Sequence, residues 1–143
     1  MGAEEIDLEA DARRYASNPY LLDTCTLLWV TNDPERLSKS ASAIWRDPNR
    51  IIAVSVVNYW EIAVKKDKLS IRDVTWYWEH RVLPYVDIEP VQIREEHIAE
   101  LLLLPQLHKD PFDRILIAQA RVENMLLVTS DQKVQEYDVR TVW

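Results

Sequence analysis

Short apolar runs that alternate with longer stretches of helical spacing constrain the fold of this chain more than any other feature. The clearest runs are YLLD at 20–23, IIAVS at 51–55 and MLLVTSD at 125–131, and two weaker strand candidates are YVDIEPV at 85–91 and VRTVW at 139–143. Helical spacing is found at 24–30, 37–48, 56–69, 74–84, 94–104 and 110–124. Strands separated by helices form βαβ units, so this pattern predicts a mostly parallel sheet with helices on both faces.

The length of 143 residues fits a single domain, which we place at residues 19–143. Residues 1–18 are polar and acidic, and three interpretations of them stay open: a disordered extension, an extra helix, or residues added for expression. They lack the apolar segment of a secretory signal, and no run approaches the ~20 residues of a membrane span. The single cysteine, Cys25, cannot form an internal disulfide. We therefore expect a cytoplasmic protein that has no membrane partner.

Glycine is nearly absent, since Gly2 is the only one. This excludes the glycine-rich loops that hold nucleotide phosphates and the glycine-flanked serine of hydrolases. The net charge of −7 argues against a protein that binds nucleic acid, unless part of the negative charge surrounds a bound cation. If the chain handles phosphate, a metal or side chains must hold it.

Acidic residues follow two of the apolar runs and lie in the helices between them. Asp23 ends the first run, and Asp131 follows the run at 125–131. Glu61 lies in the helical stretch after IIAVS, and Asp110 and Asp113 begin the stretch at 110–124. The carboxyl ends of parallel strands share one edge of the sheet, so we expect these five acids to converge there.

Carboxylates that converge without partners repel one another, and a hard divalent cation removes this cost. Oxygen ligands without cysteine or clustered histidine favour Mg²⁺, or Mn²⁺, over zinc. Such an ion polarises a phosphoryl oxygen and activates water, so phosphodiester hydrolysis is the natural reaction.

Each acid also has a simpler interpretation, which the sequence leaves open. Asp23 and Asp110 are suitable N-caps for the helices that follow them, and Asp131 is suitable for a turn. Glu61 would ordinarily lie on a solvated helix face, although its neighbours are apolar, and burial would then require a partner.

Four segments occur in a specific order: LLDTCTLLW, SVVNYWEIAVKKDKLSI, HKDPFDRILIAQA and LLVTSDQKVQEYDV, followed by a terminal VW. Together they span residues 20–143 and resemble the PIN-domain ribonucleases, specifically the VapC-like toxins of prokaryotic toxin–antitoxin pairs. The resemblance implies a three-layer α/β/α domain with a parallel sheet of about five strands. It also implies Mg²⁺-dependent cleavage of RNA and neutralisation by a VapB-like antitoxin. We further expect a homodimer.

The resemblance assigns roles to particular acids. The catalytic acids are Asp23, Glu61, Asp113 and Asp131, of which Asp23 and Asp113 are the expected metal ligands. The auxiliary residues are Asp110, Thr24 and Ser130.

Several other side chains have two open interpretations each. The candidates for contact with RNA are Lys65, Lys66, His108 and Arg114; their alternatives are a solvated helix end for the lysines, a loop histidine, and a structural ion pair for the arginine. His80 and His97 lie in amphipathic stretches, and we expect both on the surface.

Two features depart from the family. Many relatives carry histidine where this chain has Cys25, which we expect to pack as a small apolar residue, and the 18-residue lead is unusual. Other functions are less consistent with the sequence. An aspartyl phosphatase would need a second acid at Cys25, and a PIN-like DNA nuclease would need extra helices. A catalytically silent PIN-like module that acts through a protein partner stays open.

Overall fold

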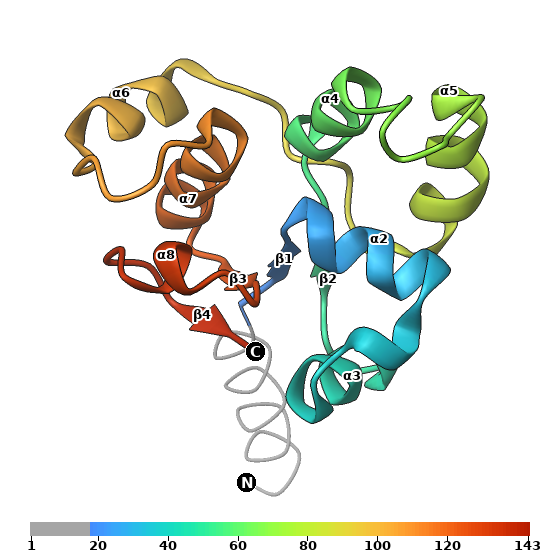
Figure 1. Ribbon diagram of the computed structural model, residues 1–143. Helices are drawn as coiled ribbons and strands as arrows, with labels where there is room; N and C mark the ends of the chain where they lie inside the picture. Colours follow the sequence, from blue (N-terminus) through green and yellow to red (C-terminus); the bar gives the residue numbers. More distant parts are fainter. Residues whose placement is uncertain (1–17) are drawn as a thin grey trace, which may run out of the picture.

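The computed structural model describes residues 18–143, so the interpretations offered for residues 1–17 lie outside the described residues (Figure 1). Its sheet has four parallel strands in the order β2-β1-β3-β4. The strands are β1 (Tyr20–Leu22), β2 (Ile52–Ala53), β3 (Leu126–Val128) and β4 (Thr141–Val142). β1 is central: Leu21 pairs with Ala53 of β2 and with Leu127 of β3. The predicted parallel sheet is confirmed.

Helices cover both faces of this sheet, as the βαβ pattern predicts. They are α2 (Thr24–Asn32), α3 (Lys39–Arg46), α4 (Val56–Val64), α5 (Val74–Tyr77), α6 (Glu95–Leu103), α7 (Pro111–Glu123) and α8 (Gln132–Gln135). A π-helical turn at Trp78–Val82 extends α5, and 3₁₀ turns lie at Pro34–Arg36 and Leu83–Tyr85. In Figure 1, α2 to α5 lie on one side of the strands and α6 to α8 on the other, which confirms the three layers.

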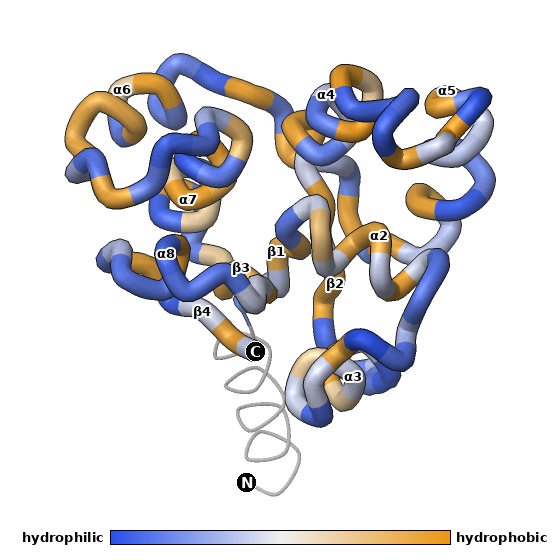
Figure 2. The backbone as a smooth tube through the Cα atoms, in the orientation of Figure 1, coloured by the Kyte–Doolittle hydropathy of each residue, from blue (hydrophilic) through white to orange (hydrophobic). Residues whose placement is uncertain are grey.

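The alternation of side chains along β1 places one hydrophobic cluster on each face of the sheet. Leu21 is fully buried among residues of α7, including Leu116 and Ile117. Its neighbour Leu22 faces the other layer and packs with Leu27 of α2 and Val128 of β3. Figure 2 shows the hydrophobic segments of the strands at the centre of the molecule, between the helical layers. A strand buried on both faces is largely apolar, and the one polar side-chain group of YLL, the Tyr20 hydroxyl, accepts a hydrogen bond from Arg50 Nη1 at 3.1 Å.

The prediction of a fifth strand at 85–91 is wrong. Val91 makes only an isolated bridge with Ser55, although the segment runs beside β2. One reason is Pro90, which has no N–H to donate to a ladder. A second is Asp87, whose side chain, instead of a backbone carbonyl, accepts the hydrogen bond from the Ile52 N–H at 2.8 Å. The segment therefore borders the sheet without forming a regular strand.

His97 was expected on the surface, and this expectation is wrong. It lies on the inner face of α6 with no exposed area, and α6 packs against α7. The Arg94 N–H donates to its Nδ1 at 3.0 Å, and its Nε2 lies 2.9 Å from Glu123 Oε1. These two partners satisfy both ring nitrogens, which makes full burial of the ring possible.

The described residues contain no helix that combines the length and the apolar character needed to cross a membrane.

Candidate active site

Three of the five acids are N-caps of helices that begin at one edge of the sheet. Asp23 follows β1, and its Oδ1 accepts a hydrogen bond from the Thr26 N–H at 2.8 Å. Asp131 is separated from the end of β3 by two residues and caps α8. Asp110 caps α7, where the Phe112 N–H donates to Oδ1 at 2.8 Å. The capping interpretation is therefore confirmed for Asp23 and Asp110, and the expected turn at Asp131 is a helix start. Capping uses Oδ1 of each of these carboxylates.

Asp113 lies in the first turn of α7 and is mostly buried beside the other acids. Burial is the main cause that raises its pKa, which reaches about 7, and the negative charges of Asp110, Asp23 and Glu61 raise it further. These four carboxylates, from three separate segments of the chain, therefore share one place. The convergence that the strand-end pattern predicted is present.

Asp23 and Glu61 are the most deeply buried acids of this group. Burial raises the pKa of Asp23, and Glu61 adds to the effect, while hydrogen bonds from Thr129 and Thr26 oppose it. Glu61 is only 6% exposed. The interpretation that it lies on a solvated face of α4 is therefore wrong. Burying these two acids together is costly for the folded protein unless a positive charge is present.

Lys65 supplies part of that positive charge. Its Nζ lies 2.6 Å from Glu61 Oε2 and 3.9 Å from Asp110 Oδ2. Partial burial lowers the pKa of Lys65, but the hydrogen bond and charge of Glu61 outweigh this, so the net pKa is raised. The lysine considered for RNA contact is thus paired with the acids, whereas Lys66 is exposed. Within residues 18–143, the other oxygen of Glu61, Oε1, is buried and has no hydrogen-bond partner.

His108 connects the remaining acid to the cluster. Its Nε2 lies 2.9 Å from Asp131 Oδ2 and 3.1 Å from Asp113 Oδ2. The Asp110 N–H donates to Nδ1 at 3.0 Å, so Nδ1 carries no hydrogen and Nε2–H is the donor to both carboxylates. Burial raises the pKa of Asp131, but hydrogen bonds from His108 and from the Lys133 N–H outweigh this, so the net pKa is lowered. His108 lies in a loop, as one interpretation expected, but it also joins Asp131 to Asp113.

Threonine hydroxyl groups lie next to Asp23. Thr24, expected as an auxiliary residue, is buried, and its Oγ1 accepts a hydrogen bond from Asn58 Nδ2 at 3.0 Å. The hydroxyls that bond to Asp23 belong to Thr129 and Thr26 and not to the expected Ser130, which is partly exposed. The sequence did not identify Thr129, because Thr129 and Ser130 are neighbours in the TSD motif. Only the path of the chain after β3 decides which of the two hydroxyls faces Asp23. The role proposed for Ser130 stays a prediction.

Arg114 and Cys25 differ from expectation. Arg114 Nη2 donates to the Leu104 carbonyl at 3.3 Å, and among the described residues it makes no ion pair. It therefore ties α7 to the segment after α6. Cys25 was expected to be packed, but it is exposed on α2. Partial burial of the sulfur, followed by the negative charge of Asp23, raises the pKa of the thiol to about 11. The thiol is therefore a poor nucleophile at neutral pH.

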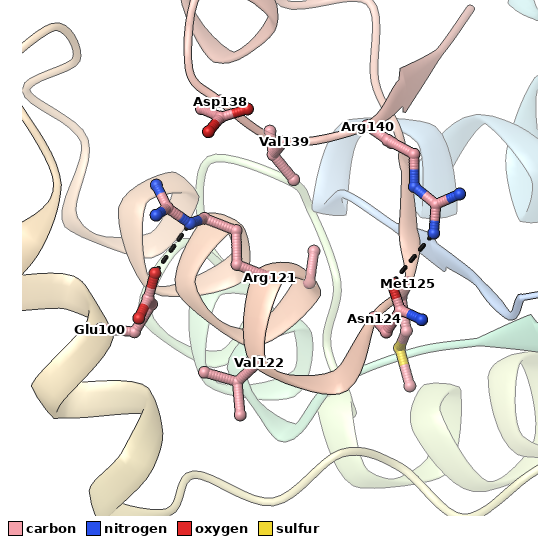
Figure 3. Close-up of a pocket in the computed structure, with 9 residues that line it drawn as sticks. Glu100, Arg121, Val122, Asn124, Met125, Asp138, Val139 and Arg140 are labelled. Carbon is pink, nitrogen blue, oxygen red and sulfur yellow. Dashed lines mark hydrogen bonds and ion pairs between the residues drawn. The ribbon is translucent and has the colours of Figure 1, made fainter.

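A pocket at the opposite edge of the sheet lies away from these acids (Figure 3). In it, Arg121 pairs with Glu100 at 2.8 Å, and Arg140 donates to the Asn124 side chain at 3.0 Å. These contacts tie α7 to α6 and to the segment that leads into β4. Both arginines of this pocket are thus paired within the protein.

The acid cluster fits a hard divalent cation on two observations. Burial first, and the charges of neighbouring carboxylates after it, raise the pKa values of Asp23 and Asp113. In addition, Glu61 Oε1 is a buried oxygen without a partner among the described residues. Near them, one ring nitrogen of His108 and one carboxylate oxygen each of Asp113 and Asp131 lie within 4.8 Å of one another. Carboxylate oxygens at this density are typical ligands for Mg²⁺ or Mn²⁺.

Comparisons with known proteins agree with this geometry. The chain is 26% identical over 120 residues to Ribonuclease VapC22 of Mycobacterium tuberculosis, a match that covers 82% of this chain and 90% of the relative. Its fold is similar to the crystal structure of VapBC2 from Rickettsia felis bound to a DNA fragment from their promoter, with a TM-score of 0.60, 17% identity, and 86% and 96% of the two chains covered.

A second solved structure, FitAcB from Neisseria gonorrhoeae, matches with a TM-score of 0.59, 18% identity, and 87% and 96% of the two chains covered. The family model described as PIN domain matches residues 20–140. That match includes every strand-end and helix-start acid of the cluster, and the chain therefore belongs to the PIN domain family.

Proposed function

We propose that this protein is a metal-dependent endoribonuclease and the toxin of a VapBC-type pair. One observation carries the proposal: Asp23, Glu61, Asp110 and Asp113 are gathered at the carboxyl edge of the sheet, and Asp131 is joined to them by His108. Burying several carboxylates together lowers the stability of the folded protein. The same group of carboxylates can bind a cation, which removes this cost. The similarity to a relative named as a ribonuclease supports RNA as the substrate.

The residues of the cluster have different roles in this proposal. Asp23 and Asp113 hold the Mg²⁺ ion, or Mn²⁺ in its place, and Asp110 lies beside them as an auxiliary acid. When bound, the ion would polarise a phosphoryl oxygen and lower the pKa of a water molecule. Glu61 turns its unpartnered Oε1 to the site as a further oxygen for the cation, and Lys65 holds the opposite oxygen, Oε2, in place. His108 keeps Asp131 next to Asp113.

The reaction is tested with purified protein and a labelled synthetic RNA. Cleavage should occur with Mg²⁺ or Mn²⁺, should stop with EDTA, and should fall by at least about 100-fold in Asp23→Asn and Asp113→Asn, because loss of a ligand should exceed the effect typical of outer-shell changes. Because water and not the ribose hydroxyl is the nucleophile, the products should carry no 2′,3′-cyclic phosphate.

The matched control is Asp138→Asn, which removes one negative charge from an exposed position at the edge shown in Figure 3. It should cleave RNA at the wild-type rate. Equal cleavage by wild type in Mg²⁺ and in EDTA would refute the metal mechanism. Absence of cleavage by folded, metal-loaded wild type on a varied RNA pool would favour the silent binding module.

A VapB-like antitoxin is the expected protein partner, since two solved structures of similar fold are named for two-component assemblies, VapBC2 and FitAcB. Co-purification with the product of an adjacent reading frame, and loss of RNA cleavage in that complex, would test it. A homodimer and a cytoplasmic location complete the proposal. Sedimentation of the purified chain and cell fractionation would test these two points.

A further inference from the structure

Asn58 is a fully buried polar residue in the first turn of α4, and its side chain reaches the segment that carries Asp23. Its Nδ2 donates to the Leu22 carbonyl at 3.2 Å and to Thr24 Oγ1 at 3.0 Å. Leu22 and Thr24 are the residues immediately before and after Asp23. Its Oδ1 accepts a hydrogen bond from the Ser55 N–H at 2.7 Å. All three polar positions of this amide are therefore used, and two of them hold the flanks of one acid.

The same helix also presents Glu61. Residues three apart lie on one face of an α-helix, so Glu61 stands one turn beyond Asn58 on the same side. On the opposite side of Asp23, its backbone N–H donates to the Val128 carbonyl of β3 at 3.2 Å. The Asp23 segment is thus held between β3 and α4, and Asn58 fixes its distance to the helix that carries the second acid.

This arrangement opposes a force within the site. The carboxylates of Asp23 and Glu61 repel each other, and the β1 strand that precedes Asp23 has only three residues. Without a clamp, the end of β1 and the first turn of α2 would relax away from α4. Residues that orient metal ligands typically affect metal affinity by 10- to 100-fold, because they set the ligand geometry before the ion arrives.

We propose that Asn58 is a positioning residue that clamps both neighbours of Asp23 and so fixes this acid opposite Glu61 for a divalent cation. The inference rests on the proposed function, because it assumes that the acid cluster binds a metal. It adds a residue that makes no contact with the ion or with RNA. Asn58 acts on the backbone carbonyl of Leu22 and on the hydroxyl of Thr24, and through them on the direction of the Asp23 side chain.

The decisive variant is Asn58→Asp. Aspartate has nearly the same shape and can still accept the bond from the Ser55 N–H, so the cap of α4 is kept. It loses both donors to the Asp23 segment and adds a negative charge near the cation. Electrostatics alone predicts tighter binding of Mn²⁺, whereas the clamp predicts weaker binding, by roughly 10- to 100-fold. Isothermal titration calorimetry with Mn²⁺ measures the sign directly.

A second variant and a control keep the test decisive if Asn58→Asp folds poorly. Asn58→Ser removes the same donors without adding charge and should also weaken Mn²⁺ binding by roughly 10-fold or more. The control is His97→Asn, which disturbs another fully buried polar residue, between α6 and α7. It should lower the melting temperature and leave Mn²⁺ affinity within about twofold of wild type.

The outcomes separate the two proposals. If wild type neither binds Mn²⁺ nor cleaves RNA, the proposed function fails. If wild type does both and the folded Asn58 variants bind Mn²⁺ as tightly, or if His97→Asn weakens binding equally, the clamp is overturned. Weaker binding in the Asn58 variants alone supports it.

Discussion

Replacing Asp113 by asparagine should stabilise the metal-free protein, and the gain should depend strongly on pH. Asparagine has the shape of aspartate and keeps an oxygen for the bond from His108 Nε2, which lies 3.1 Å from Asp113 Oδ2. It removes a carboxyl whose ionisation is opposed first by burial and then by the charges of Asp110, Asp23 and Glu61. The same change should abolish the proposed cleavage of RNA, because Asp113 is an expected metal ligand.

The magnitude follows from the pKa of Asp113 in the two states. The unfolded chain loses this proton near the ordinary value of 3.8, whereas the folded protein keeps it until about pH 7. Between these values the folded state binds one more proton, so wild-type stability falls as pH rises, by about 1.4 kcal/mol per pH unit. The asparagine variant lacks this loss. Its advantage over wild type should therefore be about 2.5 kcal/mol larger at pH 8 than at pH 5, over the roughly two units in which the proton is retained.

Urea unfolding in EDTA, followed by circular dichroism at pH 5 and at pH 8, measures this difference. Asp138→Asn again controls for the removal of one negative charge at an exposed position. An advantage of Asp113→Asn that is the same at both pH values would show that Asp113 ionises as in the unfolded chain. The acids would then not be crowded together, and the basis of the metal site would be refuted.

Three further results are expected. Mg²⁺ at one hundred times its Kd should stabilise wild type by about 2.7 kcal/mol at pH 8, and by less at pH 5, where Asp113 keeps its proton; calorimetric melting measures both, and an equal effect would contradict the coupling. His108→Ala should raise the pKa of Asp131, because it removes a hydrogen bond that favours the carboxylate; carbon-13 NMR titration would show no change if the bridge is absent. Asn124 ends α7 with a positive φ of 55°. Replacing it by glycine should be tolerated, whereas valine should lower the free energy of unfolding in urea by about 1–2 kcal/mol. Equal stability of the two variants would refute the left-handed conformation at this residue.

The order of the elements and the edge at which the acids lie could be predicted from the sequence. Periodicity records which side of each element is buried, so YLL and MLLV indicated buried parallel strands. Capping is equally local: Asp23 and Asp110 satisfy backbone N–H groups two or three residues away, and this fixed their places at helix starts. Asp23 follows a parallel strand, and Asp110 begins the helix that returns from the same edge, so local signals placed these two acids together.

The partners of those acids were decided only by the tertiary structure. His108 meets Asp131 across 23 residues, and Asn58 meets Thr24 across 34, so neither contact leaves a trace in the spacing of nearby residues. The same holds for Thr129, whose hydroxyl points to Asp23 only because β3 lies beside β1. Hydrogen bonds depend on distances of a few tenths of an ångström between elements, and only the packed layers fix such distances. The sequence therefore determined which edge carries the acids, and the packing of α4, α7 and β3 decided which neighbours hold each of them.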